Sequence, residues 1–314
     1  MTDIGISVLN RLKNKAKVRG ISYQLCLQLF CQEEFLRRLT KSEFSENFVL
    51  KGGLFIYAIT NFDSRITVDI DFMLRKMPNT PEKVNEVLEK IINTSSGNDY
   101  ITFEITNVYP ISLEKKYAGI GASLIARIKN TRTPFNIDFG VGDVIVPKSE
   151  KRNIPTQLVG FEAPRVNTYS IETTIAEKID AILNLMEYSS RMKDYYDIYY
   201  LASKFDYDGN ILVTAMRETF SNRNHIFTIE QFNKMVSFSK DEFMKKKWVA
   251  FTKKKVSSND NFDEVMKIID IFLKEPMTAV INNIPFPKIW RASQICWCEE
   301  SGTDIIVNKS ENKK

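Results

Sequence analysis

The hydrophobic periodicity of this chain changes twice, and no other feature of the sequence limits the fold as much. Leucines recur near helical spacing in the first 45 residues, and helical patterns return from Ser170 onward. Between these regions, short apolar runs such as VDIDFML and FNIDFG alternate polar with apolar residues and are separated by turn-forming residues, which is typical of strands. The sequence therefore predicts a group of strands with helices before and after it.

These changes of pattern indicate four segments. We expect N-terminal helices over residues 1–45, an α/β core over 46–165, a helical C-terminal domain over 166–300 and a polar tail over 301–314. One helix is expected inside the core, at 81–92, because its first residue is a proline, which helix N-termini favour. In the C-terminal domain one helix should begin after the N-cap Ser170, and further helices are expected at 191–203, 211–219, 229–247 and 262–272.

Composition excludes several classes of protein. The chain contains four cysteines without CxxC spacing and a single histidine, His225, which argues against a disulfide scaffold and against a zinc enzyme. It has no run of 18 apolar residues, and its N-terminus lacks the apolar centre of a secretory signal. We therefore expect a cytoplasmic protein without a membrane partner, whose chemistry depends on carboxylates, lysines and hydroxyls.

The run VDIDFML places two carboxylates next to each other. Val68, Ile70 and Phe72 alternate with acidic residues. In a strand, Asp69 and Asp71 would therefore point to one face and the apolar side chains to the other. Such a pair of acids repels itself unless a cation lies between them, and oxygen ligands suit Mg²⁺ or Mn²⁺. The alternative is an exposed edge strand with two ordinary surface acids.

Two further patterns favour a site for phosphate and metal. In FVLKGGLFIYAI, Gly52 and Gly53 lie between a strand and an apolar helix, where paired glycines allow the backbone to approach a phosphate. In FNIDFG, Asn136 and Asp138 point away from the apolar face. A third carboxylate on a neighbouring strand would complete the ligand set of a two-metal phosphoryl-transfer site.

Charged residues also occur at informative positions in the helical half. Lys178 falls within or at the edge of the apolar stripe of its helix, so its ammonium either meets an anion such as a nucleotide phosphate or extends to water. In RMKDYYD, Arg191 is expected to pair with Asp194. Asp197 lies on the same helix face and is expected to pair with Lys193. These are either surface ion pairs or part of a site.

The net charge of +5 is concentrated in residues 240–256, which hold seven lysines and two acids. Lysines with aromatic residues between them can bind a phosphate backbone and stack a base. The candidate RNA-binding residues are Lys245, Lys246, Lys247 and Trp248. The alternative is a solvated face of an amphipathic helix.

Five motifs occur in an order that resembles a known family. They are Gly52-Gly53, Arg65-x-x-x-Asp69-x-Asp71, the later strand residue Asp138, AEK with Lys178, and Arg191-x-Lys193-Asp194-x-x-Asp197. This order, which covers roughly residues 48–203, is similar to that of the AbiEii-type nucleotidyltransferase-like toxins. These belong to the DNA polymerase beta-like nucleotidyltransferase superfamily and are related to the MenT toxins. The resemblance implies an α+β fold in which a small mixed sheet with flanking helices is followed by a helical domain.

The resemblance also implies an activity and a set of site residues. It implies a Mg²⁺- or Mn²⁺-dependent enzyme that transfers a nucleotide from an NTP to an acceptor hydroxyl, with the tRNA 3′ end as the acceptor. The metal ligands would be Asp69, Asp71 and Asp138, and the other catalytic residues Lys178 and Asp194, the latter orienting Lys178 or Arg191. The nucleotide-binding residues would be Lys51, Gly52, Gly53, Arg65, Lys178, Arg191 and Asp197. Relatives carry hydroxyls just after the first glycine, which Gly53 and Leu54 do not supply.

The family further implies a toxin of an abortive-infection or toxin–antitoxin system that acts in phage defence. Its antitoxin would be encoded separately and need not form a stable complex. Two other functions remain open. One is an NTP-binding sensor without turnover, and the other is an interaction protein whose acids are structural. In the last case Mg²⁺ and NTP together should not raise the melting temperature.

Overall fold

We analysed a computed structural model of the 314-residue chain, which describes residues 3–111, 119–188, 191–255 and 260–299. The chain forms two compact units. The first comprises Met1–Asp143 and Ser149–Tyr169, and the second comprises Val144–Lys148 and Ser170–Lys314. The polar tail expected at 301–314 lies outside the described residues.

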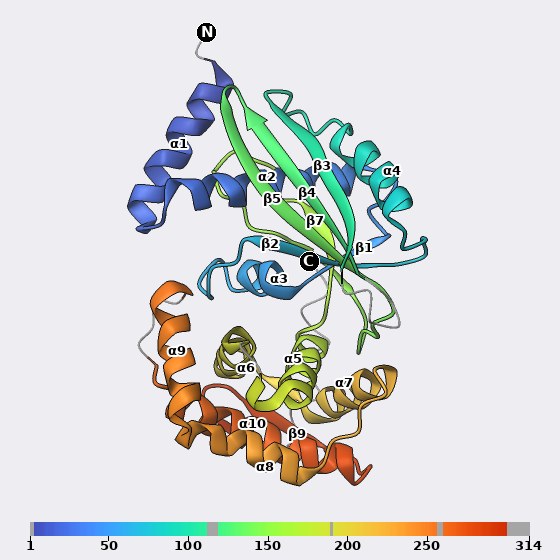
Figure 1. Ribbon diagram of the computed structural model, residues 1–314, viewed down its shortest axis with the longest axis vertical. Coiled ribbons are helices and arrows are strands. Elements are labelled where there is room, and N and C mark those ends of the chain that lie inside the picture. The colour runs from blue at the N-terminus through green and yellow to red at the C-terminus, as the bar shows by residue number, and fades with distance from the viewer. Residues whose placement is uncertain (1–2, 112–118, 189–190, 256–259, 300–314) are drawn as a thin grey trace. The chain divides into compact units, whose positions relative to one another are not determined.

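A seven-stranded mixed sheet forms the centre of the first unit (Figure 1). The strands are β1 (Phe48–Lys51), β2 (Asp69–Leu74), β3 (Ile101–Ile111), β4 (Gly119–Ile128), β5 (Thr131–Gly140), β6 (Glu150–Asn153) and β7 (Arg165–Thr168). Their spatial order is β3-β4-β5-β2-β1-β7-β6. β2 is parallel to β5 and β1 is parallel to β7, whereas the other neighbours are antiparallel. The expected mixed sheet is confirmed, and the short pair of β6 and β7 was not expected from the sequence.

Four helices accompany this sheet. They are α1 (Ile4–Arg19), α2 (Tyr23–Lys41), α3 (Gly52–Ile59) and α4 (Pro81–Ile92). α1 ends at Gly20, which has a left-handed backbone conformation with φ 65°, as glycines at helix C-termini often do. α2 covers the apolar face of the sheet, where the ring of Phe35 contacts Phe72, Phe103 and Phe135. This packing leaves the polar face of the central strands for the acidic residues.

The second unit is mainly helical, as expected. Its helices are α5 (Ile171–Leu185), α6 (Met192–Lys204), α7 (Gly209–Asn222), α8 (Ile229–Ser237), α9 (Glu242–Lys255) and α10 (Phe262–Ile281). The side chain of Ser170 caps α5 by accepting a hydrogen bond from the backbone N–H of Thr173, which confirms the predicted N-cap. A three-stranded sheet of β8 (Tyr207–Asp208), β9 (Lys288–Arg291) and β10 (Cys296–Glu299) was not expected.

Two expected helices differ from the structure by more than a few residues. The pattern at 229–247 predicted one helix, but the chain forms α8, a short 3-10 turn and then α9. The Asp241 carboxylate accepts hydrogen bonds from the backbone N–H groups of Phe243 and Met244, so this residue starts a new helix. In the other case α10 continues to Ile281 with Pro276 inside it. In the part of the chain that the structure describes, no helix has the length and apolar character needed to span a bilayer.

Candidate active site

Lys51, Asp71 and Asp138 occupy neighbouring positions on three adjacent strands of the first unit. Lys51 on β1 pairs with Asp71 on β2, and Asp71 pairs with Asp138 on β5. Directly opposed residues of neighbouring strands point to the same face of a sheet, so the three side chains form a row. Asp69 precedes this row on the same face and is exposed, whereas Ile70 is buried. The expectation that Asp69 and Asp71 share one face is confirmed.

Gly52 brings the start of α3 against Asp71. Its φ of +67° lies in the left-handed region, and a Cβ atom at this position would overlap the Asp71 carboxylate. Any residue other than glycine would therefore be strained by the positive φ and would also collide with the Asp71 carboxylate. The N-cap residue of α3, Lys51, does not cap the helix with its own side chain, and in this sense the start of α3 is uncapped. The predicted order of strand, paired glycines and helix is confirmed, and it sets the first turn of a helix beside a carboxylate.

Gly53 is surrounded by two polar side chains of the segment that precedes β2. A Cβ atom at Gly53 would lie 2.7 Å from the Thr67 Oγ1 and 3.3 Å from an Arg65 guanidinium nitrogen. Both residues are largely buried. Arg65 was among the predicted nucleotide-binding residues, but Thr67 was not. Thr67 supplies a hydroxyl beside Gly53, and its only signal in the sequence is the alternation Arg65-x-Thr67-x-Asp69.

Two residues far along the chain hold the ammonium group of Lys51. Lys51 donates to the Asp143 carboxylate at 2.6 Å and to the Tyr169 hydroxyl at 3.2 Å, and its Nζ lies 4.8 Å from the centre of the Tyr169 ring. Asp143 follows β5 and Tyr169 follows β7, so the sheet order brings them to β1. Sequence reasoning missed both residues, because nothing in the local pattern connects them to Lys51.

The carboxylates of this row suit a hard divalent cation. Across the described residues, no group of three or more His, Cys, Asp or Glu side chains is arranged to hold a metal ion. Mg²⁺, however, is commonly held by one or two carboxylates together with substrate phosphates. Asp71 and Asp138 provide two adjacent oxygen donors next to the uncapped start of α3. The donor set therefore fits a Mg²⁺ or Mn²⁺ ion that arrives with a phosphate.

The second unit contains a separate, buried cluster of charges. The Lys178 ammonium on α5 donates to Asp194 at 3.0 Å and to Asp197 at 2.5 Å, both on α6. The Arg191 Nε lies 2.5 Å from the other oxygen of Asp194. Both acidic side chains are only 1% exposed, so the alternative of surface ion pairs is wrong. The expected pair of Arg191 and Asp194 is confirmed.

Asp197 is not paired with Lys193, contrary to expectation. Its described partner is Lys178, because α5 packs against α6 and brings a buried ammonium to the inner face of that helix. Lys193 is exposed on the outer face. Lys178 therefore neither extends freely to water nor stands without an anion, since two protein carboxylates receive its charge.

Burial and two cations act in opposite directions on the pKa of Asp194. Burial alone would raise it, but the charges and hydrogen bonds of Lys178 and Arg191 outweigh burial and lower the pKa from 3.8 to about 2. Asp194 is therefore ionised at every physiological pH. Its negative charge is a fixed part of the cluster.

The lysine-rich helix α9 has a different arrangement from the one predicted. Trp248 is only 2% exposed, and its indole N–H donates to the backbone carbonyl of Asp260. Its ring packs on Phe262, so the expectation that Trp248 stacks on a base is wrong. The exposed aromatic residue of this helix is Phe243, which is 64% exposed and lies under the Lys247 ammonium.

The other two basic candidates of α9 differ in their partners. Lys245 forms ion pairs with Glu242 and Asp263, whereas Lys246 is exposed. The expectation that these lysines bind RNA remains a prediction.

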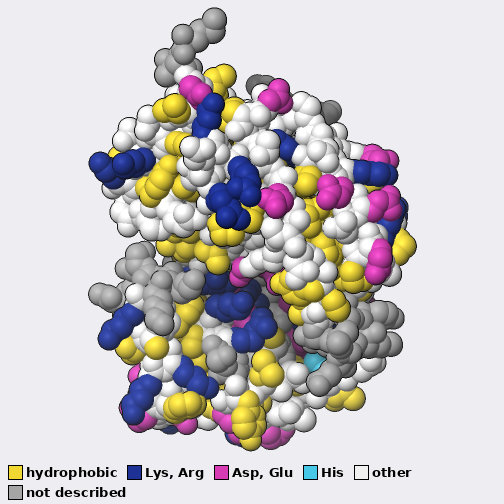
Figure 2. All heavy atoms as spheres, turned by 45° about the horizontal axis from the view of Figure 1, so that its top comes forward, with side chains coloured by type: hydrophobic (Ala, Val, Ile, Leu, Met, Phe, Trp, Pro, Cys, Tyr) yellow, Lys and Arg dark blue, Asp and Glu magenta, His cyan; other side chains and the backbone are white. Residues whose placement is uncertain are grey.

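His225, the single histidine of the chain, is partly exposed and visible as the cyan side chain in Figure 2. Its Nδ1 lies 2.7 Å from the buried Asp180, which also pairs with Arg223 at 2.8 Å. The Asp180 carboxylate thus joins the loop after α7 to α5.

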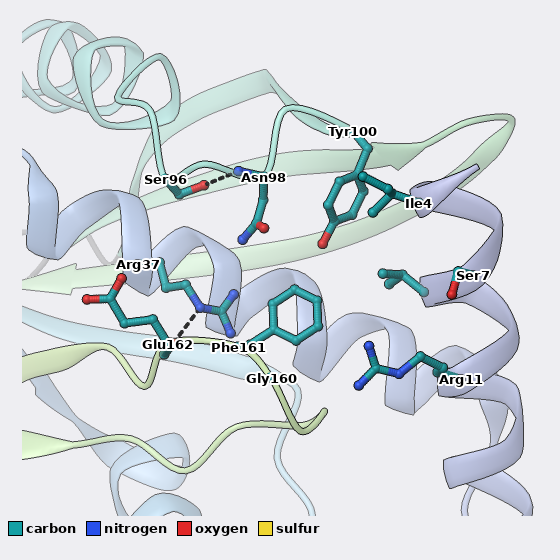
Figure 3. Close-up of a pocket in the computed structure, with 11 residues that line it drawn as sticks. Ile4, Ser7, Arg11, Arg37, Ser96, Asn98, Tyr100, Gly160, Phe161 and Glu162 are labelled. Atoms are coloured by element: carbon teal, nitrogen blue, oxygen red, sulfur yellow. Dashed lines mark hydrogen bonds between the residues drawn. The ribbon is translucent and has the colours of Figure 1, made fainter. Parts of the chain in front are cut away.

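Figure 3 shows a cavity of about 350 Å³ in the first unit, whose described lining includes no residue of the acidic row. It lies between α1, α2 and two loops, and Arg37, Tyr100 and Phe161 line it. Its described lining contains none of the residues predicted for the reaction. Arg37 already donates to Glu34 and to the backbone carbonyl of Glu162. We therefore place the candidate active site at the row of Lys51, Asp71 and Asp138, where hard ligands and an uncapped helix start coincide.

Residues 34–268 match the family described as the nucleotidyl transferase AbiEii toxin of type IV toxin–antitoxin systems. The match spans well over half of the chain. The chain belongs to the AbiEii family. Every predicted site residue, from Lys51 to Trp248, lies within the AbiEii match. Membership of a type IV toxin–antitoxin family implies an antitoxin partner for this AbiEii protein.

Two solved structures from Helicobacter pylori are similar in fold to this AbiEii protein. One is JHP933, with 13% identity, a TM-score of 0.48 and coverage of 83% of this chain and 95% of that chain. The other is described as a candidate nucleotidyltransferase, with 14% identity, a TM-score of 0.49 and coverage of 85% of this chain and 100% of that chain. No curated protein sequence matches the AbiEii protein significantly.

Proposed function

We propose that this AbiEii protein transfers a nucleotidyl group from an NTP to an acceptor hydroxyl, with the tRNA 3′ end as the acceptor. The observation that supports the proposal is the row of Lys51, Asp71 and Asp138 beside the uncapped first turn of α3. It combines hard oxygen donors, a fixed ammonium and the backbone N–H groups of a helix N-terminus, which suit phosphoryl transfer.

In this proposal the start of α3 binds the phosphates of the NTP. The backbone N–H groups at Gly52 and Gly53 favour an anion, as helix N-termini do. The Arg65 guanidinium and the Thr67 hydroxyl, which lie against Gly53, add hydrogen bonds to phosphate oxygens. Asp143 and Tyr169 already hold the Lys51 ammonium in place. Ordering the Lys51 side chain therefore costs little entropy when the nucleotide binds.

Asp71 and Asp138 would hold Mg²⁺ or Mn²⁺, with exposed Asp69 as a further ligand of the same face. When bound, such an ion withdraws charge from the triphosphate and from the attacking oxygen. Asp138 orients the acceptor hydroxyl and receives its proton as the new bond from oxygen to the α-phosphorus forms. The bond from the α-phosphorus to the β-bridging oxygen breaks, and pyrophosphate leaves.

We also propose Lys178 and Arg191 of the second unit as nucleotide-binding residues, as the family implies. Within that unit, Asp194 and Asp197 hold the Lys178 ammonium in one place. Asp194 is thus a positioning residue for both cations. A nucleotide added to the tRNA 3′ end would block that end and stop growth. This agrees with a toxin that acts in abortive infection and needs an antitoxin.

The test uses purified protein, Mg²⁺, each α-³²P-labelled NTP in turn and deacylated tRNA. We expect label on the tRNA with one NTP, and its loss in the variant Asp71→Asn/Asp138→Asn. Asp99→Asn, at an exposed acid of the first unit, is the matched control and should transfer normally. Label on the protein would show that the acceptor is a protein and not tRNA. NTP binding without any labelled product would favour the nucleotide sensor instead.

A further inference from the structure

Tyr109 extends the acidic row on the side of Asp138. On the antiparallel strands β3 and β4, Tyr109 pairs with Gly121, and Gly121 in turn pairs with Asp138 on β5. The row therefore runs across five strands in the order Tyr109, Gly121, Asp138, Asp71 and Lys51. β3 is the edge strand at this end of the sheet (Figure 1).

A β-bulge turns Tyr109 to the face of the carboxylates. Phe103 is on the apolar face, where its ring contacts Phe35, and strict alternation would place Tyr109 on that face too. The register of β3 against β4 shifts between Ile105 and Asn107. This shift reverses the alternation, so Tyr109 lies opposite Gly121 instead of an apolar residue. Bulges that redirect a side chain are frequent next to active sites.

Gly121 leaves the space that the Tyr109 ring occupies. A Cβ atom at Gly121 would lie 2.6 Å from two ring carbons of Tyr109 and 2.9 Å from its hydroxyl oxygen. The far end of the ring thus covers the one strand that separates Tyr109 from Asp138. Since strands are about 4.8 Å apart, the ring edge comes within roughly 5 Å of the strand of Asp138.

The surroundings distinguish this ring from one that only covers a glycine. Tyr109 remains partly exposed, and the neighbouring residues of its face, Asn107, Ser123 and Asn136, are polar. A flat, half-exposed aromatic surface among polar groups suits a neutral, flat partner. The nearby acid disfavours a phosphate at this place, whereas a nucleobase can stack on the ring.

We propose that Tyr109 is the stacking surface for the terminal nucleotide of the acceptor RNA, an inference that rests on the nucleotidyl transfer proposed above. The phosphate-binding features Gly52, Gly53 and Lys51 all lie beyond Asp71, at the opposite end of the row. The NTP therefore occupies that end, and the acceptor enters at the end of Tyr109. Stacking its last base on Tyr109 brings a ribose hydroxyl of the same nucleotide to Asp138.

The experiment measures each substrate separately for wild type and for Tyr109→Ala. We expect the KM for tRNA to rise about tenfold, the usual effect of losing one stacked base, and the KM for NTP to change less than about twofold. The affinity for a short single-stranded RNA ending in CCA, measured by filter binding without NTP, should fall by the same factor. Tyr109→Phe keeps the ring and should behave as wild type.

Two further variants separate stacking from a disturbed strand. Gly121→Ala should displace the flexible end of the Tyr109 ring and raise the KM for tRNA while the tyrosine is retained. Thr102→Ala, at the other end of β3, is the matched control and should leave both KM values unchanged. A higher KM for NTP alone, or unchanged RNA affinity in Tyr109→Ala, would overturn the inference. If wild type transfers nothing, the proposed function fails, and RNA binding by Tyr109→Ala still decides the inference.

Discussion

The two units each contain a cluster of aspartates, and the clusters differ in burial. In the first unit, Asp69 is exposed and Asp71 and Asp138 are half-buried on neighbouring strands. In the second unit, Asp194 and Asp197 are 1% exposed, and Lys178 and Arg191 balance their charge. The same residue type therefore serves two purposes in one chain.

The difference in burial predicts different effects of mutation in the two clusters. A buried and balanced group of charges is costly to separate and contributes to the shape of its own unit. Carboxylates that lie side by side on the partly exposed face of two central strands can reach a cation that arrives with a phosphate. We therefore expect mutations in the first cluster to change activity and mutations in the second to change stability as well.

The largest expected effect is on activity, in the first cluster. Asp71→Asn should lower the rate of nucleotidyl transfer more than about 10³-fold, because the amide cannot supply the negative charge of the carboxylate. The free energy of unfolding should change by less than about 1 kcal/mol, since the side chain is only half-buried and asparagine has nearly the same shape. Labelled-NTP assays and urea unfolding measure the two quantities. If the transfer rate of Asp71→Asn stays within tenfold of the Asp99→Asn control, the first cluster does not have the expected role in activity.

The second prediction concerns the buried cluster. Asp194→Asn should reduce the free energy of unfolding by about 3 kcal/mol, because it leaves Lys178 and Arg191 with one buried carboxylate fewer. Asp206→Asn, which removes a half-exposed partner of Arg291, is the control and should cost less than about 1 kcal/mol. Equal costs in the two variants would mean that burial of the Asp194 cluster contributes nothing.

Acid titration of the same pair of proteins sharpens this result. The folded-state pKa of Asp194 is lowered from 3.8 to about 2 by Lys178 and Arg191 against the effect of burial. Its contribution of about 2 kcal/mol is complete above pH 4 and is lost as the pH falls toward 2. The gap in unfolding free energy between wild type and Asp194→Asn should therefore narrow over this range. A gap independent of pH would show that Asp194 titrates normally.

A smaller effect is expected at the contact between α3 and β2. Gly52→Ala should destabilise the first unit by about 2 kcal/mol through its positive φ, and it should also displace the Asp71 carboxylate and lower activity. Gly97→Ala is a matched control, because Gly97 also has a positive φ but nothing within 4 Å of its Cβ position. Thermal unfolding should show a cost in both variants, larger in Gly52→Ala because its Cβ also meets Asp71, whereas only Gly52→Ala should lose transfer. Equal activity would mean that the Asp71 position tolerates movement.

The smallest effect is expected on α9. Lys246→Glu should weaken RNA binding about threefold and reduce its salt dependence, while NTP binding stays unchanged. Replacing Lys245, Lys246 and Lys247 together should have a larger effect of the same kind. Lys267→Glu on α10 changes the net charge equally at another exposed position and should bind RNA as wild type does. If Lys246→Glu and Lys267→Glu weaken RNA binding equally, the effect comes from the net charge of the protein and not from a binding surface on α9.

Local pattern was sufficient for much of the candidate site. The alternation in VDIDFML and FNIDFG predicted which face each acid takes, because a strand repeats every two residues whatever lies around it. The paired glycines predicted the turn before α3. The same reasoning failed for Trp248, since a helix pattern does not say which aromatic residue neighbouring helices cover. It failed for Lys193 because the better partner of Asp197 comes from another helix.

The sequence by itself determined the classes of element, the common face of Asp69 and Asp71, and the membership of the AbiEii family. Only the tertiary structure decided which distant groups meet: Asp143 and Tyr169 at Lys51, and Thr67 at Gly53. Only the strand register decided that Tyr109 faces the carboxylates, since a single bulged residue reverses every later side chain of β3. Periodicity is a local property of the chain, whereas register and the contact of distant segments depend on how the whole sheet packs.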